Sequence, residues 1–291
     1  MKKHPLKHTF GLCLLALFVL PGAGAAILEQ AKRSPKQEKE MQQKAAVSDL
    51  KADIVYKKIG DLELTLDLLL PRKKTDKSGR VLFPNGTPVV FYFHGGGWRG
   101  GSRYISPNDA RFFSDNGLAL ACVSYRFAKN NGLTIADCVT DCFDAARFIV
   151  KNAARYGLDS SVLLAYGHSA GGHLTLMMLM ADPGEFIGDP ALARENVSFA
   201  GGVASAPPSN FVDPEALENS GWTNSDENFI GAFGGSREEK RALAQKVSPY
   251  YWLKKDSPRT LIIHGDADPT VGITQSLWME KKARELVCSH A

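Results

Sequence analysis

A serine between two glycines, in the pattern Gly167-x-Ser169-x-Gly171, combines residue types and spacing that point to chemistry. The run 162–166 before it reads as a strand, and the run after it reads as a helix. Such a strand-to-helix turn is typical of a nucleophile elbow, where the helix N-terminus points its N–H groups and positive dipole end at the serine. Bulk two residues to either side would collide with neighbouring backbone, so glycine is needed at both positions. We therefore expect Ser169 to be a nucleophile.

A glycine-rich segment, "FHGGGW" at 93–98, ends an apolar run that reads as a buried strand. An acylating serine needs N–H donors for the oxyanion that develops on the carbonyl. One donor is the N–H of Ala170, and the other must come from a loop at the end of a neighbouring strand. We expect Gly95 and Gly96 to supply it, because a backbone without side chains can approach the reacting oxygen closely. The place of His94 ahead of the glycines favours an anchoring role over that of a base.

Strand-like and helix-like runs alternate along the chain, which predicts an α/β fold whose mostly parallel sheet carries helices on both faces. Leucines at every second position of 61–71 predict a half-buried strand. Further strands are expected within 88–97, 117–126, 161–180, 199–208 and 259–271, with a helix at 134–156 and another at the end of 161–180.

Six motifs occur in a single order along the sequence. They are HGGGW at 94–98, VSYR at 123–126, AARYGLDSS at 153–161, GHSAGGH at 167–173, SPYYWL at 248–253 and IIHGDADPTV at 262–271. Together they resemble the α/β-hydrolase esterases and lipases of the hormone-sensitive-lipase-like and feruloyl-esterase-like groups, over roughly 53–287. The resemblance implies an α/β-hydrolase fold and ester hydrolysis through an acyl-serine, with no metal and no organic cofactor.

A serine nucleophile needs a histidine as base and an acid that orients this histidine. In this fold the chain order is serine, acid, histidine. Asp266 and Asp268 both follow the strand in "IIHGDADPTV". The resemblance favours Asp268 as the orienting carboxylate and leaves Asp266 to shape the turn. Turn and capping chemistry is the alternative for both aspartates.

The base is expected after Asp268, where His290 is the only histidine in the sequence. The resemblance implies a further strand with the catalytic histidine in the loop behind it, and we interpret this chain as lacking that last strand and the base. A helix of about 13 residues spans about 20 Å, which carries His290 away from the strand ends. His168, His173 and His264 are expected to be structural.

The first 25 residues have a basic start, an apolar stretch and the small residues Ala23-Gly24-Ala25, as a cleaved secretory signal does. Without their three lysines the net charge falls from +4 to 32 − 31 = +1, and nothing then argues for nucleic acid. The apolar stretch is too short for a comfortable membrane span. We expect an exported protein, periplasmic or secreted, with no membrane span after cleavage.

The chain after the signal is expected to comprise a charged linker or loose helix at 26–51 and an α/β-hydrolase domain at 52–291. Within the domain, the turn-rich and aromatic segment 207–250 is either a cap over a pocket or a surface excursion. Cys138 and Cys142 share one helix stripe with apolar residues, which favours two small core residues over a metal or redox pair.

Two functions of different class remain open. The first is a serine carboxylic-ester hydrolase acting on a small-molecule or carbohydrate-linked ester. The alternative is a catalytically impaired or ligand-binding member on a hydrolase scaffold, with Ser169 holding a ligand carbonyl without turnover. A peptidase of the same fold is disfavoured, because the chain has no room for an additional domain. The oligomeric state is not readable from the sequence.

Overall fold

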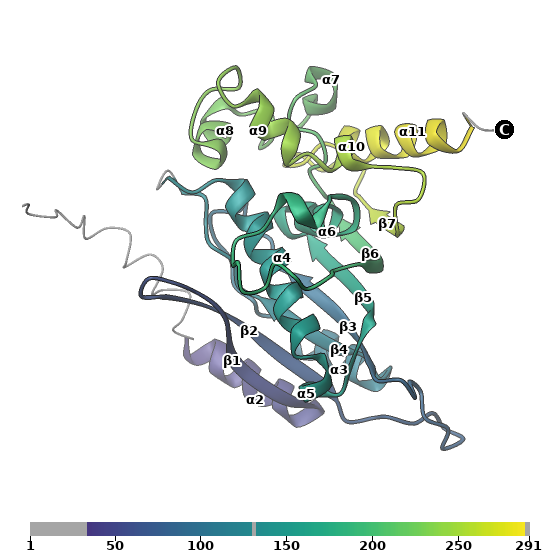
Figure 1. Ribbon diagram of the computed structural model, residues 1–291. Coiled ribbons are helices and arrows are strands. Elements are labelled where there is room, and N and C mark those ends of the chain that lie inside the picture. The colour runs from purple at the N-terminus through teal and green to yellow at the C-terminus, as the bar shows by residue number, and fades with distance from the viewer. Residues whose placement is uncertain (1–33, 130–131, 289–291) are drawn as a thin grey trace, which may run out of the picture.

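A seven-stranded sheet forms the centre of the computed structural model, which describes residues 34–129 and 132–288 (Figure 1). Its spatial order is β1-β2-β4-β3-β5-β6-β7. The pairs β1–β2 and β2–β4 are antiparallel, and all other neighbours are parallel, which confirms the mostly parallel sheet. The strands are β1 (Ser48–Ile59), β2 (Leu62–Pro71), β3 (Thr87–Phe93), β4 (Ala119–Val123), β5 (Leu158–His168), β6 (Phe199–Ser205) and β7 (Arg259–Ile263).

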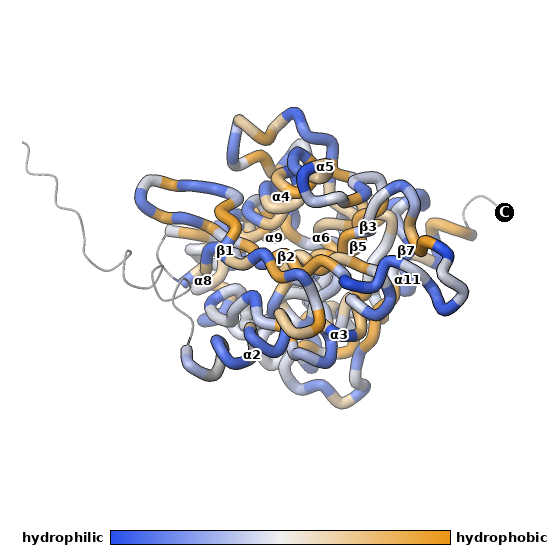
Figure 2. The backbone as a smooth tube through the Cα atoms, turned by 90° about the horizontal axis from the view of Figure 1, so that it is seen from below, coloured by the Kyte–Doolittle hydropathy of each residue, from blue (hydrophilic) through white to orange (hydrophobic). Residues whose placement is uncertain are grey.

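Helices cover both faces of this sheet, as expected. On one face α4 and α6 pack against each other, and α6 also contacts β3, β5 and β6; on the other face α2 and α3 contact β1 and β2. Figure 2 shows the hydrophobic segments of β3 and β5 in the interior, with hydrophilic segments around them. The helices are α2 (Pro35–Val47), α3 (Pro107–Asp115), α4 (Ile135–Lys151), α5 (Ala153–Tyr156), α6 (Ala170–Met180), α7 (Pro214–Leu217), α8 (Asp226–Phe233), α9 (Arg241–Lys246), α10 (Pro249–Trp252) and α11 (Thr274–Cys288), with a 3₁₀ turn η1 (Pro183–Glu185).

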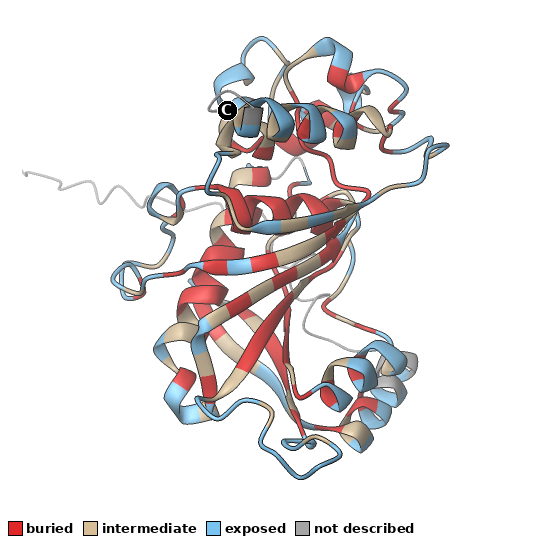
Figure 3. Ribbon diagram, turned by 90° about the vertical axis from the view of Figure 1, so that its right-hand side faces the viewer, coloured by how far each residue is buried: buried red, intermediate tan, exposed pale blue. Residues whose placement is uncertain are grey.

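Burial is concentrated in the middle of the sheet and in the helix beside it (Figure 3). All five residues of β4 and all eleven of α6 are buried. The leucines of β2 that were expected to share one face do so at Leu64, Leu66 and Leu68, which join the main core. Cys138 and Cys142 are buried free thiols in this core, and burial raises the pKa of both well above the usual range. The interpretation of the pair as core residues agrees with this placement.

A buried ionic cluster fixes α4 against β1. Lys57 Nζ lies 2.8 Å from Asp141 Oδ1 and 2.7 Å from Asp144 Oδ2. Arg126 Nε lies 2.7 Å from the other oxygen of Asp141, and Arg147 Nη1 lies 3.0 Å from Asp144 Oδ1. Both carboxylates are fully buried, so each depends on these cations to offset the loss of water.

The ordered sheet begins earlier than the sequence indicates. Of the segment 26–51, expected to be a linker or loose helix, the structure describes residues from 34 onward and places α2 and the start of β1 there. β1 begins at Ser48, four residues before the expected domain start at 52. Ser48 is already part of the sheet, because it pairs with Pro71 of β2. The proposed signal at 1–25 lies outside the described residues.

The segment between β6 and β7 carries α7 to α10, gathered at the top of Figure 1. It includes the segment 207–250, for which the sequence leaves a cap over a pocket and a surface excursion open. After β7, which pairs along one side with β6, residues 264–288 form the turn and helix α11 and contain no strand. Among the described parts of the chain there is no helix with the length and apolar content of a bilayer span.

Candidate active site

Ser169 stands at the turn between β5 and α6, as the sequence predicts. Its backbone has φ 56° and ψ −122°, a conformation that costs a residue with a side chain about 1–3 kcal/mol. Two backbone hydrogen bonds hold it there: the Ser169 N–H donates to Ser205 O at 2.8 Å, and the His173 N–H donates to Ser169 O at 2.9 Å. Neighbouring elements thus keep the serine in a strained turn at the start of a buried helix.

The flanking glycines make this turn possible. A Cβ added to Gly171 would lie 1.9 Å from the carbonyl oxygen of Phe93, and one added to Gly167 would lie 2.3 Å from the carbonyl oxygen of Gly171. Both contacts are with backbone, which cannot rotate away. The expected requirement for glycine at the two positions is confirmed.

The glycine-rich loop after β3 lies directly beside this serine. A Cβ added to Gly95 would sit 3.5 Å from Ser169 Cβ. The loop then turns through positive φ at Gly96 (119°), Gly97 (59°) and Trp98 (57°). Within residues 34–129 and 132–288, the backbone N–H groups of Gly95 and Gly96 donate no hydrogen bond. Unpaired donors beside a serine can bind an anionic oxygen.

Ala170 is the first residue of α6 and is fully buried. Its N–H belongs to the first turn of the helix, where backbone donors have no partner within the helix. The structure therefore brings together four residues predicted from the sequence: Ser169, Ala170, Gly95 and Gly96.

His94 anchors the loop at its start. Its ring stacks on Tyr125 with centroids 4.3 Å apart, and the Tyr125 hydroxyl donates to the carbonyl oxygen of His94 at 2.7 Å. Burial lowers the pKa of His94 to about 4, so the ring is neutral near pH 7. These contacts agree with an anchoring role.

Asp268 lies in the turn after β7. Its Oδ1 accepts hydrogen bonds from the backbone N–H groups of Thr270 at 2.8 Å and Val271 at 3.1 Å. Its Oδ2 lies 3.8 Å from His264 Nε2, and about a quarter of its side chain is exposed. The carboxylate is thus fixed by turn contacts and keeps one oxygen for a further partner, while Asp266 is exposed.

The segment between β6 and β7 joins the acid turn to the glycine loop. The backbone N–H of Trp222 donates to the carbonyl oxygen of Thr270 at 2.9 Å. Its indole nitrogen lies 3.2 Å from the place that a Cβ on Gly97 would take, and its ring lies 5.0 Å from that of Trp98. Trp222 is half-buried and stands beside the candidate oxyanion loop; the sequence placed it only within the aromatic segment that is either a cap or a surface excursion.

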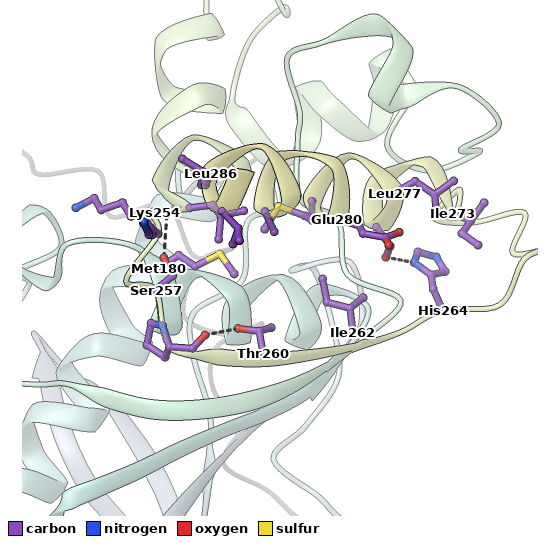
Figure 4. A pocket seen from close by; sticks show the side chains of 17 residues that line it. Met180, Lys254, Ser257, Thr260, Ile262, His264, Ile273, Leu277, Glu280 and Leu286 are labelled. Atoms are coloured by element: carbon purple, nitrogen blue, oxygen red, sulfur yellow. Dashed lines mark hydrogen bonds between the residues drawn. The ribbon is translucent and has the colours of Figure 1, made fainter. Parts of the chain in front are cut away.

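The histidines of the described residues are engaged elsewhere. His264 Nδ1 lies 2.6 Å from Ser276 Oγ, a bond drawn in Figure 4, and its Nε2 lies 2.7 Å from Val271 O. His168 is exposed, with Nδ1 3.2 Å from Ser205 Oγ. His264 is the only histidine in the described ranges within ion-pair distance of an acid. His290, the expected candidate base, lies outside the described residues.

No group of three or more His, Cys, Asp or Glu side chains that could hold a metal ion occurs in the part of the chain that the structure describes. The charged side chains nearest in sequence to the glycine loop have protein partners instead. Arg99 Nη2 donates to Asn228 Oδ1 at 2.5 Å, and Arg103 Nε lies 3.0 Å from Asp67 Oδ2.

A family model, BD-FAE, matches residues 66–283, which include the serine turn, the glycine loop and the acid turn. The chain belongs to the BD-FAE family. The resemblance to α/β-hydrolase esterases, stated from the motifs, is thereby confirmed.

Two proteins similar in sequence to this BD-FAE family member are named as esterases. Carboxylesterase NlhH of Mycobacterium tuberculosis is 30% identical over 167 residues, which are 55% of this chain and 49% of that protein. An arylesterase of Saccharolobus solfataricus is 33% identical over 118 residues, 40% of this chain and 35% of that protein. The chain thus spans between a third and a half of the length of these relatives.

A solved structure of an esterase from Thermogutta terrifontis, Est2 with butyrate bound, has the same fold. It superposes with a TM-score of 0.64 at 24% sequence identity, over 83% of this chain and 80% of that chain. The α/β-hydrolase fold expected from the sequence is therefore confirmed.

Proposed function

We propose that the chain is a serine ester hydrolase that acts through an acyl-serine intermediate. The observation that carries the proposal is the placement of Ser169 on a strained turn next to a loop whose Gly95 and Gly96 N–H groups have no partner among the described residues. Ser169 Oγ attacks the ester carbonyl carbon. The carbonyl oxygen becomes an oxyanion, which the N–H groups of Gly95, Gly96 and Ala170 bind. These donors are fixed before the reaction, so they stabilise the transition state without reorganising.

Proton transfer needs a base that takes the hydroxyl proton of Ser169 and returns it to the leaving alcohol. Asp268 is the acid that would orient such a histidine, and its Oδ2 is the oxygen not used by the turn. Water then attacks the acyl-serine while the same base takes a proton of this water. The acyl–Oγ bond breaks, the carboxylic acid leaves, and the base returns the proton to Ser169 Oγ. His173 and His264 have partners at both ring nitrogens, and His290, the expected candidate base, lies outside the described residues.

The engagement of His264 gives weight to the second function. Its ring nitrogens are engaged by Ser276 Oγ and the carbonyl oxygen of Val271, so neither is free to take a proton from a serine. A member of the scaffold without a working base would bind an ester and form at most one adduct at Ser169. This is the catalytically impaired or ligand-binding alternative.

The substrate class follows from the residues around the loop. Trp98 and Phe211 pack edge to face with ring centroids 5.7 Å apart, and Trp222 lies 5.0 Å from Trp98. Trp98 and Phe211 are buried, so the half-buried Trp222 is the aromatic side chain of this group that an apolar or aromatic acyl group could contact. We propose small-molecule or carbohydrate-linked esters of this kind as substrates.

Labelling with paraoxon tests the proposal, because a Thermogutta terrifontis esterase 2 structure is described as phosphorylated by paraoxon. Intact mass spectrometry of the wild type should show a single diethyl phosphate adduct that Ser169→Ala lacks. Hydrolysis of p-nitrophenyl butyrate should fall by about 10⁴ in Asp268→Asn, as expected for loss of the orienting acid. The matched control Asp266→Asn, in the same turn but exposed, should stay within twofold.

The outcomes separate the two functions. A stoichiometric adduct at Ser169 with no turnover supports the impaired or ligand-binding member. An adduct that persists in Ser169→Ala, or a wild type that neither labels nor hydrolyses, refutes the ester hydrolase.

We also propose that residues 1–25 direct export and that the mature protein is periplasmic or secreted. Mass spectrometry of the exported protein should find an N-terminus at Ala26. A full-length chain retained in the cytoplasm contradicts this proposal.

A further inference from the structure

Trp98 and His173 form a buried pair beside the candidate site. Trp98 is 1% exposed and His173 is fully buried. The indole Nε1–H of Trp98 donates to His173 Nδ1 at 3.2 Å, and His173 Nε2 lies 2.7 Å from the carbonyl oxygen of Val247. A carbonyl only accepts, so Nε2 carries the proton and Nδ1 is the acceptor. One neutral tautomer satisfies both bonds.

The pair links three separate segments. Trp98 belongs to the glycine loop, His173 to the first turns of α6, and Val247 to the stretch between α9 and α10. His173 is also tied to the nucleophile, because its N–H donates to Ser169 O at 2.9 Å. The His173 side chain therefore connects the glycine loop to the segment above it, and the backbone N–H of the same residue holds the serine turn.

The loop needs such a connection. Trp98 has φ 57°, in a region that bulky residues rarely adopt, and it ends the run of positive φ angles that starts at Gly96. Conformations of this kind persist where surrounding contacts hold them. The Trp98 ring meets His173 edge to face at 5.0 Å on one side and Trp222 at 5.0 Å on another.

We propose that His173 is a positioning residue for the reaction: by accepting from Trp98 it sets the Gly95–Gly96 loop at the distance that binds the oxyanion. This proposal rests on the proposed function. A rotation of the Trp98 backbone would move Gly96, which is only two residues away. A misplacement of about 1 Å can cost about 10²-fold in rate, as can the loss of one oxyanion donor.

Burial lowers the pKa of His173 to about 4, which agrees with a neutral ring that accepts at Nδ1 near pH 7. Described groups that face His173 from other elements are Trp98, Phe211 and the Val247 carbonyl. None of them carries a charge. His173 acts here through hydrogen bonding and not as an acid or base.

Two amide variants separate positioning from core packing. In His173→Asn the amide oxygen takes the place of Nδ1, so the Trp98 acceptor is kept. In His173→Gln the amide reaches the place of Nε2, so the Val247 contact is kept and the Trp98 acceptor is lost. Trp98→Phe removes the donor and keeps a ring in the core.

The experiment measures kcat and KM for p-nitrophenyl butyrate, the rate of Ser169 phosphorylation by paraoxon, and Tm, on the full chain. We expect His173→Gln and Trp98→Phe to lose about 10- to 100-fold in kcat and in phosphorylation rate, with KM within about threefold, because oxyanion donors act on the transition state. His173→Asn should keep kcat within about fivefold of the wild type, because it restores the acceptor.

Several results would overturn the inference. One is a kcat within threefold of wild type in both His173→Gln and Trp98→Phe. Another is an equal loss in His173→Asn and His173→Gln that follows the drop in Tm, which is the signature of core packing. If His173→Gln does not fold, Trp98→Phe decides by the same limits. A reactive wild type with equally reactive variants overturns this inference alone, whereas an unreactive wild type overturns it together with the proposed function.

Discussion

Replacing Gly171 by alanine tests whether the serine turn depends on contact between backbones. Gly171 is buried in the first turn of α6, and its neighbour is the end of β3. The added Cβ would lie 1.9 Å from Phe93 O, 2.7 Å from Phe93 C and 2.8 Å from His94 O. All three atoms belong to the backbone where β3 leads into the glycine loop.

The magnitude follows from the required displacement. Ordinary contact begins at 3.4 Å, so α6 and β3 must separate by about 3.4 − 1.9 = 1.5 Å at this point. Adding a methyl group to a packed core costs about 1–3 kcal/mol when side chains can adjust. Here the obstacle is buried backbone, so we expect a loss of at least about 3 kcal/mol, or a Tm lower by about 6–12 °C.

The assay is thermal unfolding of Gly171→Ala against Gly100→Ala, together with paraoxon labelling of Ser169. Gly100 is a matched control in the glycine loop, since its added Cβ would meet nothing closer than 4.0 Å and its φ is not positive. We expect Gly100→Ala to melt within about 2 °C of the wild type. If Gly171→Ala melts as high as Gly100→Ala and labels at the wild-type rate, the steric account of the turn is refuted.

Three further predictions concern the buried Lys57, the buried histidines and the half-buried indole of Trp222. Lys57→Met leaves two buried carboxylates without their shared cation and should destabilise the fold by about 3–5 kcal/mol in urea, whereas Lys58→Met, at an exposed pair, should stay within about 0.5 kcal/mol. The pKa of His94 and of His173 is about 4 in the folded protein, below that of an unfolded histidine. As the pH falls from about 6.5 to 4, the unfolded chain therefore binds more protons than the folded one, and the free energy of unfolding drops by about 3 kcal/mol for each histidine. Equal urea midpoints at pH 7 and pH 4.5 would contradict this. Trp222→Ala should lower the kcat/KM of p-nitrophenyl benzoate relative to the acetate by about two- to tenfold, because an aromatic contact contributes about 0.5–1.5 kcal/mol. An unchanged ratio would exclude Trp222 from contact with the acyl group.

Local contacts explain which parts of the site were predictable. The serine turn, its glycines and the donor at Ala170 lie within five residues of one another, so their steric and hydrogen-bonding requirements appear as a pattern in the sequence. The turn of Asp268 is equally local, since its partners are Thr270 and Val271. Short-range geometry of this kind is fixed by residue type and spacing.

The contacts that the sequence did not reveal are distant along the chain. Trp98 and His173 are 75 residues apart, and Lys57 and Asp141 are 84 apart. The helix α6 gives no sign of which side meets the loop, because all eleven of its residues are buried and its apolar residues show no preferred face. His173 could be interpreted only as structural on that basis.

Strand β1 was missed for a different reason. Its sequence, SDLKADIVYKKI, has no steady alternation, and its register with β2 shifts between Lys51 and Ile54 and again between Val55 and Lys57. A bulge adds a residue and changes which face the following side chains occupy. The period of two on which the strand prediction depends is therefore broken twice.

The strain at Ser169 and the neighbouring loop is best understood as one arrangement. Two non-glycine residues with positive φ, Ser169 and Trp98, lie on adjoining turns, and each costs about 1–3 kcal/mol. Both have a contact with another element: Ser169 donates to the carbonyl oxygen of Ser205 in β6, and Trp98 donates from its indole to the ring of His173 in α6, whose backbone N–H also bonds to Ser169. His173 therefore stabilises both strained residues at once. A change that frees its ring should release the loop first, because the backbone bond to Ser169 does not depend on the side chain.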